Sequence, residues 1–301
     1  MKNFLLILCV SAFFISCKEN SIKVSAESPS SKIKLDFDVN KDGQPYYMVH
    51  FNNKTIIDTS FMSFDFKDLA PLKDDFKIVG STVGTADETW QMPWGEQLDV
   101  RNHYNELVVN LEEQSELKRK LNIHFKIYDD GLGFRYEFPE QENLKEVLIT
   151  DENTQFNLTG DYKVWWIPGD WDIYEHLYSE TKFSEIDALS KQNNANLNAT
   201  YIPENAVNTP VTMKTDDGLY LSFHEADLTN YSGMTLKVDS KNLDMVSELV
   251  GSEILGGKAK ITIPFNTPWR TIQIAEKAGD LIESKMILNL NRNLIRFLFQ
   301  Y

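Results

Sequence analysis

The chain has 301 residues, and its 45 acidic side chains outnumber its 30 Lys and Arg, which gives a formal net charge of −15. This excess of negative charge argues against nucleic acid as a partner, because nucleic-acid binding depends on basic patches. The length is sufficient for one large all-β domain or two ordinary ones. The only two cysteines, Cys9 and Cys17, lie near the amino terminus.

The first residues have the pattern of an export signal. Lys2 precedes an apolar run over residues 4–16, which is too short for a membrane-spanning helix of about 20 residues. Cys17 follows Ile15 and Ser16 as in a bacterial lipobox, so we predict a lipoprotein signal peptide over residues 1–17 and lipidation at Cys17. The alternative is a plain signal peptide that contains a cysteine. Membrane contact is then expected only through the lipid, on an exported outer-membrane lipoprotein.

After the leader, residues 18–32 are rich in Ser, Glu and Lys, and we predict that they form a flexible tether. From residue 33 the apolar residues recur with a period near two, which indicates strands with one buried face. The clearest such segments are residues 33–39, 46–51, 106–111 and 122–128.

Three turns of the same chemistry separate these segments. The sequences NKDG (40–43), YDDG (128–131) and TDDG (215–218) each end in Asp-Gly, which is a strong signal for a tight hairpin turn. The first also resembles the opening of an EF-hand loop, but position twelve is Val49 rather than a bidentate Glu.

Helical periodicity is confined to residues 275–287 and a shorter stretch at 116–120. Many short strands with little helix predict a large all-β, antiparallel β-sandwich over residues 33–290.

Residues 87–107 (DETWQMPWGEQLDVRNHYNEL) form the first candidate site. They combine Trp90 and Trp94 with carboxylate, amide, guanidinium and imidazole groups. Aromatic faces pack against the C–H surfaces of sugars while polar groups bond the hydroxyls, so this composition fits carbohydrate binding. The alternative is that the tryptophans belong to the core and the charges to a solvated rim.

Residues 164–186 form the second candidate. The segment begins as a buried strand, turns at Pro168 and Gly169, and then carries acidic residues on an irregular loop. Carboxylates on such loops are the usual ligands of calcium, although most acidic loops bind nothing. A third segment places His224 beside Glu225 on a strand, where neighbouring residues point to opposite faces, so at most one of them is expected in a given cleft.

Several motifs, in order along the chain, together resemble the amino-terminal domain of glycoside hydrolase family 97, a family of α-glucosidases and α-galactosidases from Bacteroidetes. The motifs are ETWQxxWGE (88–96), RNHYNEL (101–107), DGLGFRYEFP (130–139), WIPGD (166–170), MKTDDGLYL (213–221) and NTPWRTI (266–272). The resemblance covers residues 33–291. It implies a β-super-sandwich of the galactose-mutarotase type that packs against a catalytic (β/α)8 barrel.

The resemblance also implies site residues. In the family, a calcium ion in the active site is held mainly by barrel glutamates and by one glutamate of the sandwich, and the matching position here is Glu175. The side chains expected near an α-linked oligosaccharide are Trp94, Glu96, Arg101, Asn102 and His103.

The last residues depart from the family pattern. Residues 292–301 read RNLIRFLFQY, with two Arg and no acid, where the family continues through a linker into the barrel. We therefore expect an aberrant tail over residues 291–301 of a truncated or split product. Without the barrel, the chain is expected to be inactive alone and to bind calcium weakly or not at all, unless a separate barrel chain completes the site.

Two other functions remain open at this point. One is a surface glycan-binding lipoprotein without catalysis, which would bind through Trp90 and Trp94. The other is a mutarotase-type sugar epimerase, in which His103, His176 or His224 would act with a carboxylate in proton transfer.

Overall fold

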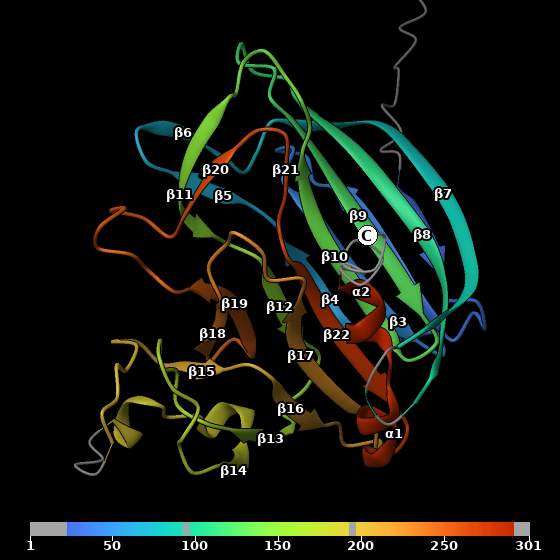
Figure 1. Ribbon diagram of the computed structural model, residues 1–301, viewed down its shortest axis with the longest axis vertical. Coiled ribbons are helices and arrows are strands. Elements are labelled where there is room, and N and C mark those ends of the chain that lie inside the picture. Colours follow the sequence, from blue (N-terminus) through green and yellow to red (C-terminus); the bar gives the residue numbers. More distant parts are fainter. Residues whose placement is uncertain (1–22, 93–94, 96, 193–196, 292–301) are drawn as a thin grey trace, which may run out of the picture.

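The computed structural model describes residues 23–92, 95, 97–192 and 197–291. Every strand pair in this part of the chain is antiparallel, and the strands form three sheets (Figure 1). The prediction of a large antiparallel β-sandwich with few short helices is confirmed. None of the helices in the described ranges has the length and hydropathy to cross a membrane.

The largest sheet has ten strands in the order β14-β13-β16-β17-β22-β10-β9-β8-β7, with β21 paired beside β10. In chain order its strands are β7 (Phe76–Gln91), β8 (Asp99–Glu113), β9 (Lys120–Tyr128), β10 (Gly131–Phe138), β13 (Lys163–Trp166), β14 (Ser179–Lys182), β16 (Val211–Lys214), β17 (Tyr220–Ala226), β21 (Phe265–Asn266) and β22 (Trp269–Ala275).

The second sheet has eight strands, β1-β2-β3-β4-β12-β19-β18-β15, and the third has four, β20-β11-β5-β6. Their bounds are β1 (Val24–Glu27), β2 (Ile33–Val39), β3 (Pro45–Phe51), β4 (Lys54–Phe61), β12 (Gln155–Leu158), β19 (Asp244–Leu249), β18 (Met234–Asp239) and β15 (Ala206–Asn208), and then β20 (Ala259–Thr262), β11 (Glu146–Glu152), β5 (Phe64–Phe66) and β6 (Leu69–Leu72).

The core lies between the ten-stranded and eight-stranded sheets, and aromatic side chains bridge them. Tyr47 of β3 packs on Phe134 of β10 with ring centroids 5.0 Å apart, and Phe156 of β12 packs on Phe223 of β17 at 5.5 Å. Every second residue of these strands is buried in this core, because successive side chains point to opposite faces of a sheet. Burying each such ring contributes about 2–3 kcal/mol to stability.

The three predicted Asp-Gly turns join consecutive antiparallel strands, as expected. Tyr128 pairs with Gly131 across the β9–β10 turn, and the other two turns join β2 to β3 and β16 to β17. Gly131 has φ +146°, and an added Cβ would lie 2.3 Å from the carbonyl oxygen of Ile272, so only glycine fits there.

Two predictions about local structure are wrong. Residues 24–27, which were placed in a flexible tether, form β1 and extend the eight-stranded sheet by pairing with β2. Residues 116–120 form a turn and the start of β9 rather than a helix.

The predicted helix over residues 275–287 is divided. β22 continues to Ala275, and two short helices follow, α1 (Ala278–Glu283) and α2 (Met286–Leu290). The remaining helical turns are η1 (Phe183–Glu185) and η2 (Leu189–Lys191).

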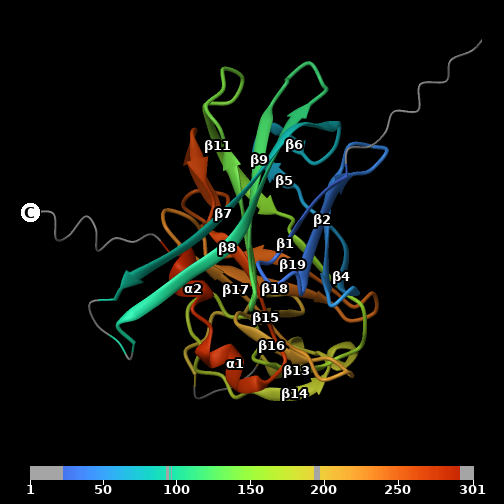
Figure 2. The same cartoon turned by 90° about the vertical axis from the view of Figure 1, so that its right-hand side faces the viewer.

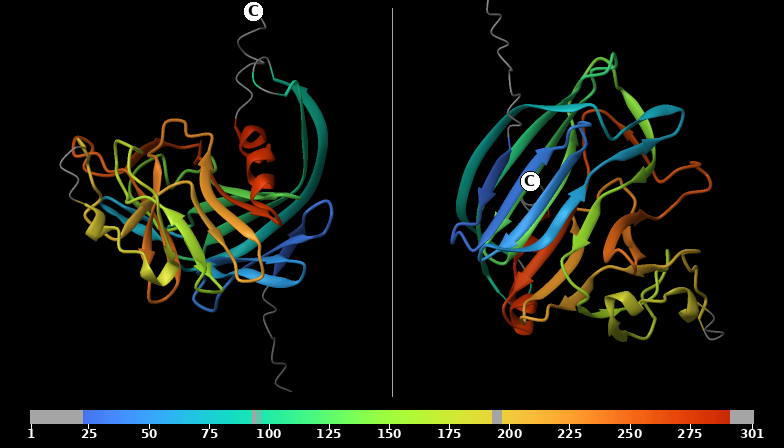
Figure 3. Two further views of the ribbon diagram at one scale, coloured as in Figure 1. Left: turned by 90° about the horizontal axis from the view of Figure 1, so that it is seen from below. Right: turned by 180° about the vertical axis from the view of Figure 1, so that it is seen from behind.

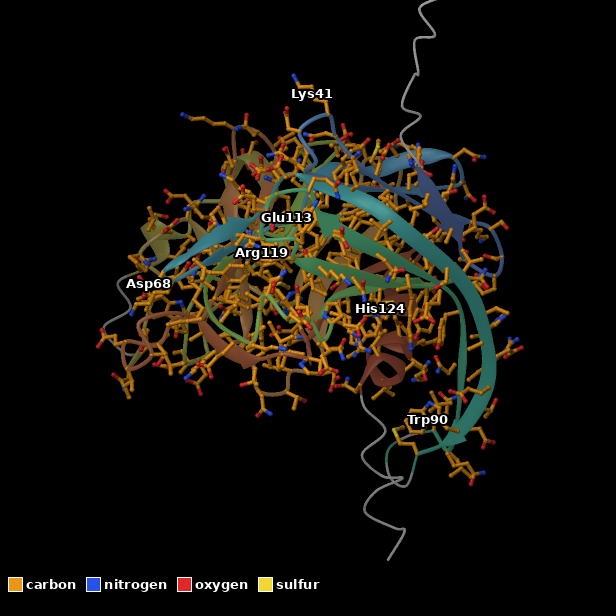
Figure 4. All side chains as sticks on the ribbon, turned by 90° about the horizontal axis from the view of Figure 1, so that it is seen from above. Lys41, Asp68, Trp90, Glu113, Arg119 and His124 are labelled. Carbon is orange, nitrogen blue, oxygen red and sulfur yellow. The ribbon has the colours of Figure 1, made fainter. Side chains whose placement is uncertain are left out.

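The β7–β8 hairpin extends beyond the sandwich as a long curved arm. Its strands bend around α2, as the turned views show (Figures 2 and 3). Trp90 lies near the tip of the arm, whereas Glu113 and Arg119 lie at its opposite end (Figure 4). Most of β7 is exposed, so the sandwich core does not hold the outer half of the arm.

Candidate functional site

The structure divides the predicted sugar-binding residues of β8 between the two faces of the arm. Asn102 is buried, and it shares the α2-facing side with Tyr104. Arg101 and His103 occupy the alternating positions of β8, and both border the groove between the arm and the two helices. Trp94 and Glu96 lie outside the described residues.

The side chain of Asn102 makes two hydrogen bonds within the protein. Its amide nitrogen donates to Glu88 Oε1 at 3.1 Å, and its amide oxygen accepts from the Tyr128 hydroxyl at 3.2 Å. Burial raises the pKa of Tyr128, so this phenol stays protonated and remains a donor. Asn102 therefore connects β8 to Glu88 of β7 and to Tyr128 of β9 by hydrogen bonds.

Arg101 forms a bidentate pair with Asp87 of β7, with distances of 2.7 and 2.8 Å. This hydrogen bonding lowers the pKa of the exposed Asp87 carboxyl. His103 lies near both Asp87 and Asp129.

Arg101 and His103 line one wall of an open groove of about 240 Å³. The facing wall comes from α1 and α2, through Glu283, Met286 and Asn289. The tip of the β9–β10 turn closes the groove with Asp130, whose pKa is raised by burial. The residues that line the groove carry a guanidinium, an imidazole, an amide, an ammonium group and three carboxyl groups.

Sequence reasoning missed Asn289. Its amide oxygen accepts from Trp90 Nε1 at 2.8 Å, and its amide nitrogen donates to the Arg101 carbonyl at 2.9 Å. Asn289 thereby joins α2 to both strands of the arm. These contacts link residues almost two hundred positions apart, so no local sequence pattern predicts them.

The second candidate segment forms an ordered loop between β13 and β14. Asp170 is buried beneath it, where Oδ1 accepts from the backbone N–H groups of Asp172 and Ile173 at 2.9 and 3.1 Å. Its Oδ2 lies 3.1 Å from both His176 Nε2 and the backbone nitrogen of Thr200. These four contacts fix the loop from below.

Glu175 lies on the exposed side of this loop, next to the exposed side chains of Tyr174, Leu177 and Tyr178. As a metal ligand, Glu175 fits the role of a single donor, since its carboxylate is accessible. Asp170 does not fit, because hydrogen bonds already occupy both of its oxygens. Within the described ranges, no group of three or more His, Cys, Asp or Glu side chains could hold a metal ion.

The structure does not bring Glu175 together with Arg101, Asn102 and His103. Five strands lie between β13 and β8 in the ten-stranded sheet. At about 4.8 Å per strand, β13 and β8 lie about 29 Å apart along the sheet, and Glu175 lies on the loop that follows β13. His224 and Glu225 also diverge, as strand geometry predicts: His224 contacts Thr209 on one face, and Glu225 contacts Arg270 on the other.

Residues 26–292 match the family described as Glycosyl-hydrolase 97 N-terminal. The chain belongs to this family. The family 97 domain accounts for nearly all of the described residues, in agreement with the resemblance found in the sequence.

Solved structures of family 97 enzymes from Pseudoalteromonas sp. strain K8 are similar to this chain. A variant in complex with panose is 35% identical with a TM-score of 0.80, and the match covers 89% of this chain and 38% of that one. A complex with acarbose gives 35% identity and a TM-score of 0.79 over the same shares. This chain therefore spans about two fifths of the length of these relatives.

A retaining alpha-galactosidase from Bacteroides thetaiotaomicron is 22% identical over 260 residues, which are 80% of this chain and 37% of that enzyme. A beta-arabinopyranosidase has a similar fold, with a TM-score of 0.71, 21% identity, and coverage of 84% of this chain and 40% of its own.

Proposed function

We propose that this family 97 domain forms one side of the sugar and calcium cleft of an α-glycosidase, and that a (β/α)8 barrel forms the other side. The observation that carries the proposal is the loop over residues 171–178, which presents Glu175 among exposed aromatic and apolar side chains. Large exposed apolar groups in one patch are typical of surfaces that contact another domain.

The rigidity of that loop supports the same role. Asp170 and His176 hold the loop from below, so Glu175 is presented at a defined position before any metal arrives. A calcium ion needs six to eight oxygen ligands, of which Glu175 would supply one or two. The barrel would supply the others.

The domain alone is expected to be inactive. Glycoside hydrolysis requires two carboxyl groups on either side of one glycosidic bond, about 5–9 Å apart. Of the two other acids of the loop, Asp170 is buried with both oxygens hydrogen-bonded, and Asp172 Oδ2 accepts from the Thr200 hydroxyl at 2.6 Å. The relatives solved with panose and acarbose suggest an α-linked glucan as the substrate class.

The first test is hydrolysis of p-nitrophenyl α-glucoside and α-galactoside by the purified chain, with and without calcium. We expect no turnover in any of the four conditions. Calcium-dependent turnover would show that the sandwich carries a complete catalytic set and would overturn the proposal.

A second test addresses Glu175 directly. The domain would replace the corresponding part of the Pseudoalteromonas enzyme, and activity would be titrated with calcium. We expect Glu175→Gln to raise the calcium concentration needed for half-maximal activity at least ten-fold, while Glu253→Gln on a distant exposed loop leaves it unchanged. Equal calcium responses in both variants would remove Glu175 from the metal site.

The geometry at two of the three candidate histidines does not favour an epimerase. His176 is buried against Asp170, and His224 lies on the opposite face of β17 from Glu225. A mutarotase-type reaction needs a histidine and a carboxylate that face the same sugar. His103 is the remaining candidate, because it lines the open groove together with Asp130 and Glu283. Polarimetry with glucose and galactose tests this site, and we expect no catalysed mutarotation.

Export and anchoring remain part of the proposal. Cys17 lies outside the described residues, so its lipidation rests on the sequence pattern alone. Labelling with a palmitate analogue should modify the wild-type chain and leave Cys17→Ser unmodified.

A further inference from the structure

A second groove lies on the outer face of the ten-stranded sheet, and neither Glu175 nor Arg101 and His103 line it. It has a volume of about 510 Å³ and runs over β13, β16, β17 and β22, with α1 as its side wall. Figure 1 shows these strands side by side, with α1 at their end. Its volume falls within the range of about 300–1,000 Å³ that is usual for small-molecule sites.

Strand parity explains which side chains reach this groove. On β17, Leu221 and Phe223 point into the core, so Tyr220, Ser222 and His224 point outward. The same alternation on the neighbouring strands brings out Trp165, Thr212 and Gln273. None of the side chains that line the groove is Asp, Glu, Lys or Arg, although the protein as a whole is strongly acidic.

One end of the groove is aromatic. The rings of Trp165 and Tyr220 are nearly parallel, with an interplanar angle of 15° and centroids 6.5 Å apart. Trp165 is held in place because its Nε1 donates to Glu180 at 2.8 Å, and Lys163 bonds the same carboxylate at 2.6 Å. Half-exposed, fixed aromatic rings offer apolar faces that suit the C–H surface of a sugar ring.

The rest of the floor is polar and uncharged. Thr212 and Ser222 share a hydrogen bond of 3.1 Å, which leaves each hydroxyl with further bonding capacity. The Gln273 amide makes no side-chain hydrogen bond within the described part of the chain. His224 uses Nδ1 for Thr209, so Nε2 remains available, and burial lowers the pKa of this imidazole and keeps it neutral.

We propose that this groove is a second carbohydrate-binding site, which takes a neutral pyranose unit of an oligosaccharide against Trp165 and Tyr220. The aromatic rings would cover the apolar face of the sugar, and the amide, imidazole and hydroxyl groups would bond its hydroxyls. No charged side chain lines the groove itself, and the Lys214 ammonium lies over the Tyr220 ring, 5.2 Å from its centroid. The site goes beyond the proposed cleft, because neither Glu175 nor Arg101 and His103 line it.

The test is a titration of the full chain with maltotriose and with raffinose, followed by two-dimensional ¹H–¹⁵N NMR. We expect saturable shifts in the Trp165 indole N–H and in the amides of β13, β16, β17 and β22, and no comparable shifts with glucuronate. Shifts confined to the region around Arg101 and His103, or no saturable shifts with either sugar, would overturn the proposal.

Variants separate the groove from the other sites. Trp165→Ala and Tyr220→Ala are each expected to weaken binding at least ten-fold, and Trp165→Phe, which keeps an aromatic ring, to weaken it less than Trp165→Ala. Trp90→Ala and Glu175→Gln should bind as the wild type does. Binding that survives both alanine variants, or that is lost in Trp90→Ala, would contradict the assignment.

Circular dichroism would confirm that each variant is folded. If the alanine variants do not fold, the wild-type shifts decide the question by their location. The NMR result does not depend on a barrel. The calcium titration of Glu175→Gln in the hybrid enzyme tests the proposed cleft, whereas the sugar-induced shifts at Trp165 in the isolated chain test the groove.

Discussion

Arg270 is a fully buried cation, and its neighbours explain how the interior tolerates it. Two of its nitrogens donate to Glu152 at 2.7 and 2.8 Å, and the third donates to Glu225 at 2.7 Å. The Tyr231 hydroxyl also donates to Glu152, at 3.0 Å. The network links β17 and β22 of the ten-stranded sheet to β11 of the four-stranded sheet, so its role is to fix the packing of the sandwich.

We expect Arg270→Met to lower the free energy of unfolding by about 3–5 kcal/mol, because two carboxylates would remain buried without their cation. Urea denaturation measures the change. The matched control is Lys260→Met, which breaks the exposed Lys260–Glu146 pair and should cost at most about 1 kcal/mol. Similar losses in both variants would contradict the role assigned to Arg270.

Glu113 should make stability depend on pH. Burial alone would raise the pKa of Glu113, but the hydrogen bonds and charge of Arg119 outweigh it and hold this pKa below its usual range. A carboxyl whose pKa is lower in the folded state stabilises the fold above its unfolded pKa of about 4.3, and this contribution is lost as the pH falls through the folded value.

Glu113→Gln is therefore expected to flatten the pH dependence of the unfolding free energy below about pH 5. Denaturation curves collected from neutral to acidic pH would show it. Glu253→Gln serves as the comparison and should keep the wild-type slope. An unchanged slope in Glu113→Gln would mean that other carboxyl groups dominate acid unfolding.

At the scale of elements, the β7–β8 arm depends on α2. Met286 and Leu290 of α2 pack with Tyr128 and Trp269 in a small cluster separate from the main core. An added Cβ at Gly133 would lie 2.6 Å from a methyl group of Leu290, which shows how closely α2 approaches β10. Asn289 then ties the helix to the arm through Trp90 and Arg101.

Asn289→Ala is expected to loosen the arm without unfolding the sandwich. Losing two hydrogen bonds of about 1 kcal/mol each should speed amide hydrogen exchange near residues 88–91 and 99–102 by about five- to thirty-fold. Asn143→Ala, which removes a single amide-to-carbonyl bond to Leu117 elsewhere, should leave exchange in the arm unchanged. Unchanged exchange in the arm of Asn289→Ala would show that packing alone holds it.

At the scale of the whole molecule, the sandwich encloses its core but leaves the loop over residues 171–178 with exposed apolar side chains. Leu177 is 89% exposed and Tyr178 64% exposed, whereas the aromatic side chains between the sheets are fully buried. Exposing such a patch to water is unfavourable in free energy, so the patch favours contact with another apolar surface.

We expect the isolated chain to self-associate weakly through this loop. In light scattering, the double variant Leu177→Ser, Tyr178→Ser should lower the apparent mass at high concentration toward that of a monomer. Ile254→Ser changes a residue that is 98% exposed on a different loop and should have no such effect. Equal behaviour of the two variants would remove the loop as a contact surface.

The sequence by itself determined the strands and their turns, because period-two burial and Asp-Gly turns are local properties of the chain. The long ordered motifs likewise identified the family. The short strand β1 escaped prediction because it has only four residues and its apolar side chains, Val24 and Ala26, become half-buried only once it pairs with β2 at the edge of the sheet.

Only the tertiary structure decided how the candidate residues meet. It separated Glu175 from Arg101 by the width of the sheet, buried Asn102 against Tyr128, and joined Asn289 to the arm. It also assembled the groove at Trp165 and Tyr220 from strands that are distant in the chain. The physical reason is that the backbone of a strand decides which of its side chains point to which face of the sheet. Which residues lie beside them on the next strand depends on strand order, and the residues of one strand do not encode that order.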